Sequence, residues 1–409
     1  MLASEFERHK DRLAKILYGS YENNTFYRGL LTNFPSFYLE SYENWCELPI
    51  VKKNMIQDNW ENFVSHTEVE NNPRIISYTT SGTTGAPMTV YRHRSEELFL
   101  TKLLWKERQK WATDIMKWKL LYLYRRLESK RQDVLTIAND YYLDLSEKSI
   151  LSYCKSIEEY EPHWIIGPAT AVTRLAQVFK QMNKSFPSLK LIELYGEMLL
   201  PHQRRIIEDT FQCPVINHYG TREFYVMSYE CPQKRMHAKN DHLFFEVINN
   251  ESKLQGKYQG ELVVTSLTNT FMPLIRYYVG DIVTFEHQNG TCECGNNNII
   301  LTPNGGRISD LIHTKTKTFT NVVFDRYFSF YLGNQPNVIK EFQVIQESLE
   351  HFRVLLVPGS SFSYGKLNEL EYHLRKVLED EQVEFEFVSH IPNNESGKTP
   401  TFLSKINAK

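Results

Sequence analysis

The run Thr80-Ser81-Gly82-Thr83-Thr84-Gly85-Ala86-Pro87 combines hydroxyl groups and glycines at a density that a solvated loop does not require. Glycines let backbone N–H groups approach phosphate oxygens and allow positive φ, while the hydroxyls add donors. The flanking residues 74–78 and 89–91 are typical of strands. The run therefore indicates an anion-binding loop, although an ordinary Ser/Thr-rich hairpin turn has the same pattern. It is a poor Walker loop, because no Lys-Ser/Thr pair follows Gly85.

The middle of the chain alternates between apolar strands and amphipathic helices. This alternation is typical of an α/β fold with a parallel sheet, whose ligands bind at the carboxyl ends of the strands. The spacing of apolar side chains predicts strands over 164–168 and 189–197 and helices over 170–183 and 201–211. Nearer the N-terminus we expect helices over 5–19, 95–116 and 146–160, and loop character over 21–45.

The pattern changes twice toward the C-terminus. After residue 240, short strands separated by Gly- and Asn-rich turns predict an antiparallel β appendage. From residue 310 onward, a hairpin at 338–357, a helix at 366–380 and a strand at 383–389 predict a small α+β unit. The expected fold class is therefore α/β, with a large N-terminal domain over 1–308 that contains mixed and parallel sheets, and a small mobile C-terminal domain over 309–409.

The bulk properties fit a globular protein of about two domains. Of the 409 residues, 41% are hydrophobic and 23% are charged, which supports a large core. The formal net charge of −2 gives no basic excess, so neither nucleic acid nor an anionic membrane is an expected partner. Six cysteines are too few for a disulfide scaffold, and neither a secretory signal nor a membrane-spanning apolar run is evident. We therefore expect a cytoplasmic protein.

Four further segments follow the loop in order along the chain. They are Asn217-His218-Tyr219-Gly220-Thr221-Arg222-Glu223, Arg276-Tyr277-Tyr278-Val279-Gly280-Asp281, Gly306-Arg307 and Asn394-Glu395-Ser396-Gly397-Lys398. Together with the loop, they resemble the adenylate-forming (acyl-AMP) superfamily, and most closely its phenylacetate-CoA ligase-like branch, which includes short members from capsular polysaccharide clusters. The resemblance covers nearly the whole chain, and five motifs in one order are far more specific than any single motif.

The resemblance implies a site for ATP. The loop of Ser81, Gly82, Thr83, Thr84 and Gly85 would hold the β- and γ-phosphates. The other implied contacts are Tyr219 with Gly220 on the adenine, Gly196 and Glu197 lining the purine pocket, Thr221 at the α-phosphate, Glu223 on Mg²⁺, and Arg307 on the ribose and phosphate. Asp281 has the chemistry of a ribose binder, although a turn aspartate has the same pattern. Arg276 is as consistent with a structural ion pair as with a ligand contact.

Lys398 is the expected catalytic residue. It lies in a Ser-Gly-Lys turn near the C-terminus, and an ammonium group can bridge the attacking carboxylate and the α-phosphate. A solvated lysine in a tail is the alternative. By resemblance, the small domain rotates after adenylation, with a hinge at Ser309 or Asp310, so that a thiol can enter.

The chain departs from the family pattern at two places. Ala86 or Met88 stands where many relatives carry a lysine, so the pyrophosphate contact would rest on hydroxyls, backbone N–H groups and the metal, with Arg92 or Arg94 as candidate substitutes for the lysine. Residues 120–145 do not match the glycine-rich wall that holds an aromatic acid in the closest ligases. This second departure puts phenylacetate in doubt as the substrate.

Two pairs of soft ligands lie in the turn-rich region, Cys231 with His237 and Cys292 with Cys294. Three thiolates and one imidazole suit a structural Zn²⁺ ion in tetrahedral geometry. The resemblance favours this interpretation, because similar positions recur in the branch. The alternatives are four unrelated reduced residues, or His242 as the nitrogen ligand.

These observations predict an ATP-dependent ligase that forms acyl-AMP from a small aryl or aliphatic carboxylate. The acyl group would pass to a thiol, either CoA or the phosphopantetheine of a carrier protein. ATP, Mg²⁺ and structural Zn²⁺ are the expected cofactors, and a homodimer is left open. Two alternatives remain: a ligase that captures the adenylate with an amine to form an amide, and a nucleotide-binding relative without turnover.

Overall fold

The computed structural model of the chain describes residues 2–64, 69, 72–79, 88–123, 133–137, 147–254, 257–286, 290–307, 311–315, 318–320, 324, 328, 339–378, 382–391 and 400–406. The chain forms two compact units. Unit 1 consists of Met1–Thr113 and Tyr219–Asn304, and unit 2 consists of Asp114–His218 and Gly305–Lys409. The boundary expected at residue 308 and the hinge expected at Ser309 or Asp310 lie outside the described residues and stay predictions.

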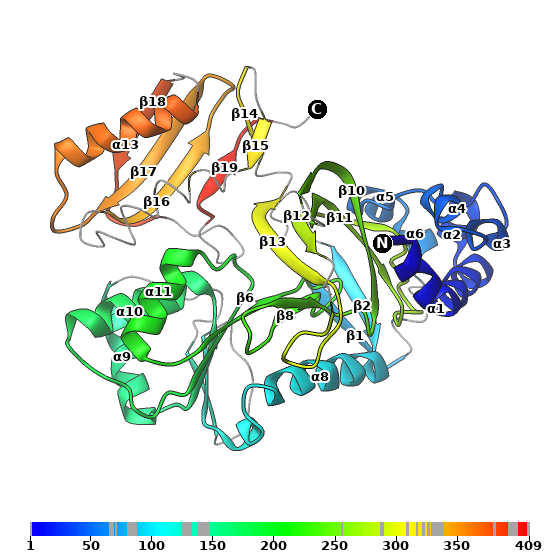
Figure 1. Cartoon of the computed structure of the whole chain (residues 1–409), viewed down its shortest axis with the longest axis horizontal. Helices are drawn as coiled ribbons and strands as arrows, with labels where there is room; N and C mark the ends of the chain where they lie inside the picture. Colours follow the sequence, from blue (N-terminus) through cyan, green and yellow to red (C-terminus); the bar gives the residue numbers. More distant parts are fainter. Residues whose placement is uncertain are drawn as a thin grey trace. The chain divides into compact units, whose positions relative to one another are not determined.

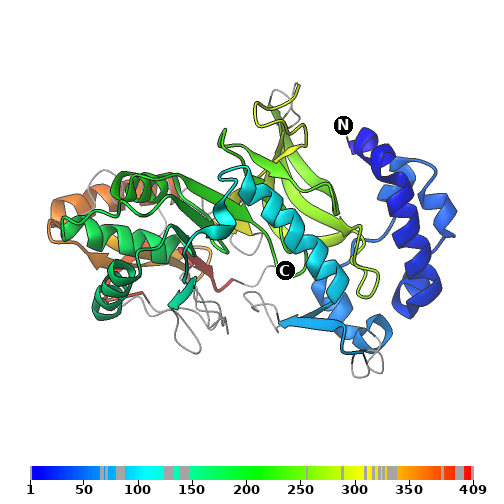
Figure 2. The same ribbon diagram turned by 90° about the horizontal axis from the view of Figure 1, so that it is seen from below.

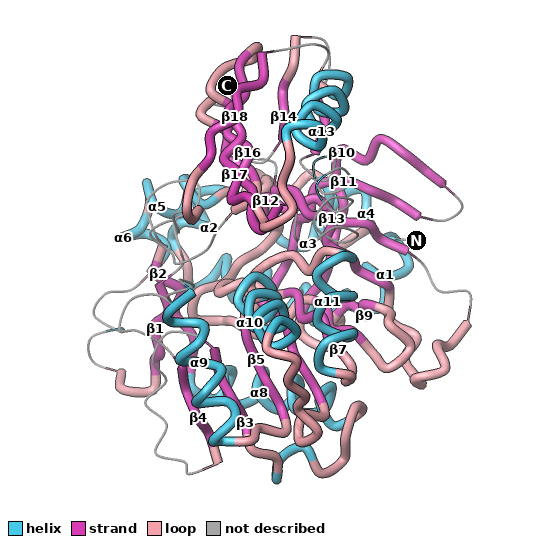
Figure 3. The backbone as a smooth tube through the Cα atoms, turned by 90° about the vertical axis from the view of Figure 1, so that its left-hand side faces the viewer, coloured by secondary structure: helices cyan, strands magenta, loops and turns pink. Residues whose placement is uncertain are grey.

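A parallel sheet forms the first half of unit 2. Its strands occur in the order β7-β6-β5-β3-β4, and all of the neighbouring pairs are parallel. Helices α9, α10 and α11 pack against this sheet (Figure 3). The elements are β3 (Leu120–Leu123), β4 (Val134–Ile137), α9 (Glu147–Tyr160), β5 (Trp164–Gly167), α10 (Ala169–Gln181), β6 (Leu191–Tyr195), α11 (Pro201–Phe211) and β7 (Val215–Tyr219), preceded by the short η1 (Ile115–Lys117). The predicted strand–helix alternation is therefore confirmed.

The helices of this sheet pack on one of its faces. Along α10, the buried residues Val172, Leu175, Ala176 and Phe179 recur at helical spacing. They join alternate strand residues, such as Ile192 of β6, in one apolar cluster. Because successive strand residues point to opposite faces, the residues between them point away from the helices.

The second half of unit 2 is a smaller α+β structure. A four-stranded sheet has the order β18-β17-β16-β19, in which β16 and β17 form the predicted antiparallel hairpin. Figure 1 shows α13 lying along this sheet. The elements are β14 (Leu311–His313), β15 (Thr318–Thr320), β16 (Ile339–Gln346), β17 (His351–Pro358), α13 (Tyr364–Val377), β18 (Gln382–Phe387) and β19 (Phe402–Ser404). Leu370 and Leu374 of α13 share its core with strand residues such as Val354.

Unit 1 contains the antiparallel strands expected after residue 240. Its strands occur in the order β10-β11-β12-β13-β9-β8, and a separate hairpin joins β1 to β2. The elements are β1 (Ile75–Thr79), β2 (Thr89–His93), α8 (Arg94–Gln109), β8 (Ser228–Glu230), β9 (Met236–Ala238), β10 (Leu243–Leu254), β11 (Lys257–Ser266), β12 (Tyr277–Glu286) and β13 (Ile300–Arg307). The pairings of β10 with β11 and of β11 with β12 are antiparallel, as predicted, and β8 and β9, which lie before residue 240, also pair antiparallel.

The N-terminal part of unit 1 is more helical than the sequence predicted. The expectation of loop character over 21–45 is wrong, because three short helices occur there, each with a local start signal. The Asn24 side chain caps α2, Pro35 opens α3 and the Ser41 side chain caps α4. The helices are α1 (Leu2–Asn23), drawn in blue in Figure 2, α2 (Thr25–Leu30), α3 (Pro35–Tyr38), α4 (Tyr42–Cys46), α5 (Lys53–Asp58) and α6 (Trp60–Phe63).

A buried ion pair ties these short helices to the strands of unit 1. Arg276 Nη2 lies 3.1 Å from Glu246 Oε1, with the two side chains 3% and 0% exposed. Trp45 donates from Nε1 to the other carboxylate oxygen, and Arg276 Nη1 donates to the carbonyls of Cys46 and Leu48. Arg276 is therefore a structural ion-pair partner, which resolves the alternative left open by the sequence.

Among the described residues, no helix combines the length and the apolar character needed to cross a lipid bilayer.

Candidate functional site

Two of the five predicted motifs lie outside the described residues. They are the phosphate loop, with Ser81, Gly82, Thr83, Thr84 and Gly85, and the segment that carries Lys398. The strands on either side of the loop pair antiparallel, with Thr79 opposite Thr89. Arg307 is the last residue of β13.

The segment after β7 forms a compact turn in unit 1. The Thr221 carbonyl accepts from Tyr225 N at 2.8 Å, and Thr221 Oγ1 accepts from Phe224 N at 3.3 Å. Gly220 is required, because a Cβ there would lie 1.9 Å from the Tyr225 carbonyl oxygen. Within the described part of the chain, the half-buried carboxylate of Glu223 has no hydrogen bond or ion pair. The role of Glu223 as an Mg²⁺ ligand stays a prediction.

Arg92 supports this turn. It is one of the two residues, with Arg94, that the sequence offers as a substitute for the missing loop lysine. Its guanidinium is 2% exposed, donates to the Arg222 carbonyl and lies 3.5 Å from Glu97. The rings of Tyr78 and Tyr225 lie 5.4 and 5.9 Å from it. These contacts hold Arg92 in place beneath the turn, so its described role is structural.

Tyr219 and Asp281 meet although they are far apart in sequence. The Tyr219 hydroxyl donates to Asp281 Oδ2 at 2.6 Å. Asp281 was expected after a strand but lies within β12, where Val279, Gly280 and Asp281 stand opposite Leu262 alone. The bulge is possible because Gly280 adopts a φ of +79°. Bulges redirect side chains, and this one brings a carboxylate 9% exposed to the tyrosine.

Gly196 and Glu197 follow β6 in unit 2. Gly196 has a φ of +76°, which a side chain would disfavour, so the chain turns sharply at the carboxyl end of the strand. Glu197 Oε2 accepts from the backbone N–H of Thr170 at 2.8 Å, in the first turn of α10. A carboxylate there satisfies an unpaired helix N–H and interacts favourably with the helix dipole. The Glu197 side chain therefore has a structural partner, and its backbone is left for the predicted purine contact.

A polar cluster at the strand ends of unit 2 was missed by the sequence analysis. It consists of Tyr122, Glu193, Tyr195 and His218, and we call it the strand-end cluster. His218 Nδ1 donates to Glu193 Oε1 at 3.2 Å, and the Tyr195 hydroxyl donates to that of Tyr122 at 3.1 Å. Its signal was a charged residue inside the apolar strand Leu191–Tyr195, where a buried carboxylate needs a partner.

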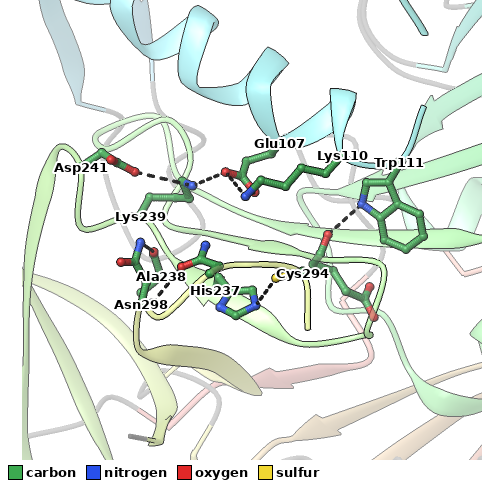
Figure 4. A network of polar contacts seen from close by, with 11 residues as sticks. Glu107, Lys110, Trp111, His237, Ala238, Lys239, Asp241, Cys294 and Asn298 are labelled. Carbon is green, nitrogen blue, oxygen red and sulfur yellow. Dashed lines mark hydrogen bonds and ion pairs between the residues drawn. The ribbon is translucent and has the colours of Figure 1, made fainter. Parts of the chain in front are cut away.

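The four predicted metal ligands lie together in unit 1. The ligand atoms of Cys231, His237, Cys292 and Cys294 are all within 4.8 Å of one another, and Cys294 Sγ is 3.3 Å from His237 Nε2 (Figure 4). Burial lowers the pKa of His237 to about 4, which keeps the imidazole neutral, as a metal ligand must be. His242, the rival ligand, instead hydrogen-bonds to the Phe224 carbonyl through Nε2.

Two tight turns bring the cysteines of this cluster together. In one turn Lys234 N donates to the Cys231 carbonyl at 2.8 Å, and in the other Gly295 N donates to the Cys292 carbonyl at 2.8 Å. Lys234 and Gly295 both have positive φ. Beside the cluster, Lys239 Nζ lies 2.6 Å from Glu107 Oε1, and Lys110 Nζ lies 2.9 Å from Glu107 Oε2 (Figure 4). The donor set and its closure fit a tetrahedral Zn²⁺ ion.

Comparisons with known proteins agree with the motifs. Residues 311–405 match the family described as the CapK C-terminal domain. Protein CapK of Staphylococcus aureus is 26% identical over 259 residues, which cover 62% of this chain and 55% of CapK. Phenylacetate-coenzyme A ligase of Thermus thermophilus is 24% identical over 359 residues, which cover 82% of this chain and 77% of that ligase. This chain thus spans about half the length of CapK.

A solved structure supports the same assignment of the fold. A 2-hydroxyisobutyryl-CoA ligase, crystallised in its postadenylation state with R3-HIB-AMP, superposes with a TM-score of 0.73 at 17% identity. The match covers 97% of this chain and 88% of that ligase. By sequence the chain is similar to CapK and to phenylacetate-coenzyme A ligase, and its fold is that of the 2-hydroxyisobutyryl-CoA ligase, so the comparisons agree with the predicted resemblance to a CapK-type, phenylacetate-CoA ligase-like member of the adenylate-forming superfamily.

Proposed function

We propose that the chain is an ATP-dependent ligase that forms acyl-AMP from a small carboxylate, releases pyrophosphate and transfers the acyl group to a thiol. The observation that carries the proposal is the Tyr219–Asp281 hydrogen bond beside the Gly220–Glu223 turn. Relatives by sequence and by fold are adenylate-forming ligases. The thiol is CoA or the phosphopantetheine of a carrier protein.

Asp281 and Tyr219 supply the nucleotide-binding part of this function. A carboxylate such as Asp281 can accept hydrogen bonds from two vicinal hydroxyls, which are the ribose hydroxyls of ATP. Tyr219 would lay its ring against the adenine, and its hydroxyl fixes the Asp281 carboxylate in one orientation. Thr221, one turn later, would reach the α-phosphate, while Gly196 and Glu197 would line the purine with backbone.

Lys398 and the phosphate loop would supply the chemistry. The substrate carboxylate attacks the α-phosphorus, a bond forms between them, and the bond to pyrophosphate breaks. Two anions must approach each other, so preorganised cations and donors lower the barrier more than any proton transfer does. Lys398 would bridge the two reactants, and residues 309–409 would then rotate as a domain to admit the thiol.

Two metal ions belong to the proposal. The Glu223 carboxylate offers the hard oxygen ligand that Mg²⁺ prefers, and the ion would neutralise phosphate charge. Zn²⁺ would occupy the cluster of Cys231, His237, Cys292 and Cys294 and brace the turns that hold these residues. We place the activity in the cytoplasm, where these thiols stay reduced.

The test is ATP–pyrophosphate exchange with a panel of carboxylic acids. Exchange with at least one acid is expected, and the Asp281→Asn variant should raise the KM for ATP about 10-fold or more, since a charged hydrogen bond to ribose is lost. Lys398→Ala should lower kcat by about 100-fold or more while nucleotide binding changes little. Asp58→Asn, in the exposed part of α5, is the matched control. Absence of exchange with every acid, despite ATP binding, would contradict the proposal.

A further inference from the structure

The strand-end cluster lies on the face of the parallel sheet that points away from α9, α10 and α11. Ile192 and Leu194 of β6 belong to the apolar cluster under these helices, so Glu193 and Tyr195 point the opposite way. The parallel register sets Tyr195 beside His218 on β7. Tyr195 and His218 lie at the carboxyl ends of β6 and β7. Open α/β sheets bind ligands at this edge of the sheet, where the carboxyl ends of the strands meet.

Glu193 is an unusual residue for the interior of a strand. Its side chain has no exposed surface, and the His218 side chain that pairs with it is 13% exposed. A buried charge destabilises a fold unless it is paired, and an apolar residue would serve the strand equally well. The carboxylate orients the imidazole of His218, because it accepts a hydrogen bond from Nδ1. The other ring nitrogen, Nε2, therefore points away from Glu193.

The two tyrosines of the cluster complete a polar surface. Their rings are nearly parallel, at 15° with centroids 6.1 Å apart, and their hydroxyls lie side by side. The Tyr195 ring also lies 6.4 Å from the His218 ring. An imidazole and two phenol hydroxyls together can both donate to and accept from a neutral polar group.

We propose that the strand-end cluster binds the acyl part of the substrate and selects carboxylic acids that carry a hydroxyl group over unsubstituted hydrocarbon acids. The inference rests on the proposed function. Within unit 2, Tyr195 directly precedes Gly196, which that function assigns to the nucleotide. An acid bound against the cluster would therefore lie beside the backbone proposed to contact the purine. A site built to hydrogen-bond a hydroxyl discriminates strongly against the analogue that lacks it, because its polar groups are left unpaired.

Matched pairs of acids test the proposal in ATP–pyrophosphate exchange. The pairs are phenylacetate with para-hydroxyphenylacetate, benzoate with meta-hydroxybenzoate, and propionate with lactate. In every pair that is accepted, the hydroxylated acid should have a kcat/KM at least about 10-fold higher. An equal or better unsubstituted acid in the accepted pairs would overturn the inference and leave the proposed function intact. No exchange with any acid would instead count against the proposed function.

Variants that lack a single hydroxyl group test which residues select the hydroxylated acid. Tyr122→Phe and Tyr195→Phe each remove one hydroxyl, and each should reduce the preference for the hydroxylated acid about 10-fold without changing the KM for ATP. Tyr153→Phe, on the helix α9 side of the sheet, is the matched control and should change neither. If the Tyr122 and Tyr195 variants keep the wild-type preference, the cluster does not read the acid.

Glu193 is a positioning residue, so its test needs a different readout. Glu193→Gln keeps an acceptor for His218 Nδ1 but weakens the hydrogen bond that orients the imidazole, because hydrogen bonds to a charged acceptor are the stronger ones. The KM for the hydroxylated acid should therefore rise in the variant, while the KM for its unsubstituted partner and the KM for ATP stay the same. An unchanged KM for the hydroxylated acid would contradict a role of Glu193 through His218.

Discussion

Both units bury a carboxylate completely, but they pair it with different cations. Glu246 of unit 1 faces Arg276, whose charge is permanent, and Glu193 of unit 2 faces His218, whose charge depends on pH. The first pair is closed by Trp45 and by backbone carbonyls, and it ties helices to strands. The second lies at strand ends beside two tyrosines. The pair of Glu246 with Arg276 therefore ties helices to strands, whereas the pair of Glu193 with His218 belongs to the acid site that we propose.

The Cys/His cluster joins two tight turns of unit 1, and its loss should have the largest effect on stability. The purified protein should contain about one zinc ion per chain, and Cys292→Ser should lose that ion. Because the ion's binding energy is part of the folding energy, the free energy of unfolding should fall by on the order of 5 kcal/mol. Metal analysis and urea unfolding measure both quantities.

The exposed Cys46 provides a control for the zinc prediction, because Cys46→Ser removes a thiol outside the cluster. It should leave the metal content and the stability nearly unchanged. Wild-type protein that contains no metal after purification without chelators, and does not gain stability from added zinc, would show that the cluster is merely four reduced side chains.

The next largest effect on the free energy of unfolding is expected from the buried ion pair of Glu246 with Arg276. Glu246→Gln leaves the Arg276 guanidinium buried without its counter-charge, so the free energy of unfolding should fall by about 3–5 kcal/mol. Combining Glu246→Leu with Arg276→Met removes both charges and should recover at least half of that loss. Urea unfolding at neutral pH measures both variants. A single variant as stable as the wild type would mean that the pair is not a structural tie.

A third carboxylate, Glu96 of unit 1, should make the stability of the protein depend on pH. Burial raises the pKa of Glu96 from 4.5 to about 7, despite Arg92 and a hydrogen bond from Thr268. Between these two values the folded protein holds a proton that the unfolded chain has lost, so stability falls as pH rises. The total loss across that window is on the order of 3 kcal/mol, and Glu96→Gln should abolish it.

Unfolding experiments at intervals from pH 5 to pH 8 measure the effect of Glu96. The exposed Glu22→Gln on α1 is the control and should keep the wild-type slope. A Glu96→Gln variant whose stability follows the wild-type slope would show that Glu96 is ionised throughout this window.

The sequence predicted the parts of the fold whose periodicity extends over a full element. Helix α11 matches its expected bounds because a proline opens it and a residue in the left-handed conformation, Gln212, ends it. The helices between 21 and 45 were missed because four to six residues complete barely more than one turn, too short for a repeating apolar pattern. Local capping residues, Asn24 and Ser41, were the available signal.

The candidate site was predicted only where rare residue types or a motif marked it. The Cys/His cluster was found because soft ligands are few in this chain, and Tyr219 and Asp281 because each belongs to a recognisable segment. The link from Glu193 to His218 was missed because it spans 25 residues and depends on strand register. The bulge that redirects Asp281 likewise depends on a partner strand, and no local pattern specifies it.

The smallest effect on stability is expected at Glu193, the buried carboxylate of the acid site that we propose. Glu193→Gln is the same change as Glu246→Gln at an equally buried position, yet it should alter the free energy of unfolding by less than about 1 kcal/mol. The reason is that an imidazole has a neutral form, so removing its partner carboxylate need not leave a buried charge, whereas a guanidinium is always charged. Urea unfolding of the two variants side by side at pH 8 measures the contrast. If Glu193→Gln lowers the free energy of unfolding as much as Glu246→Gln does, the pair of Glu193 with His218 is a structural tie as well. The two buried carboxylates would then not differ in role.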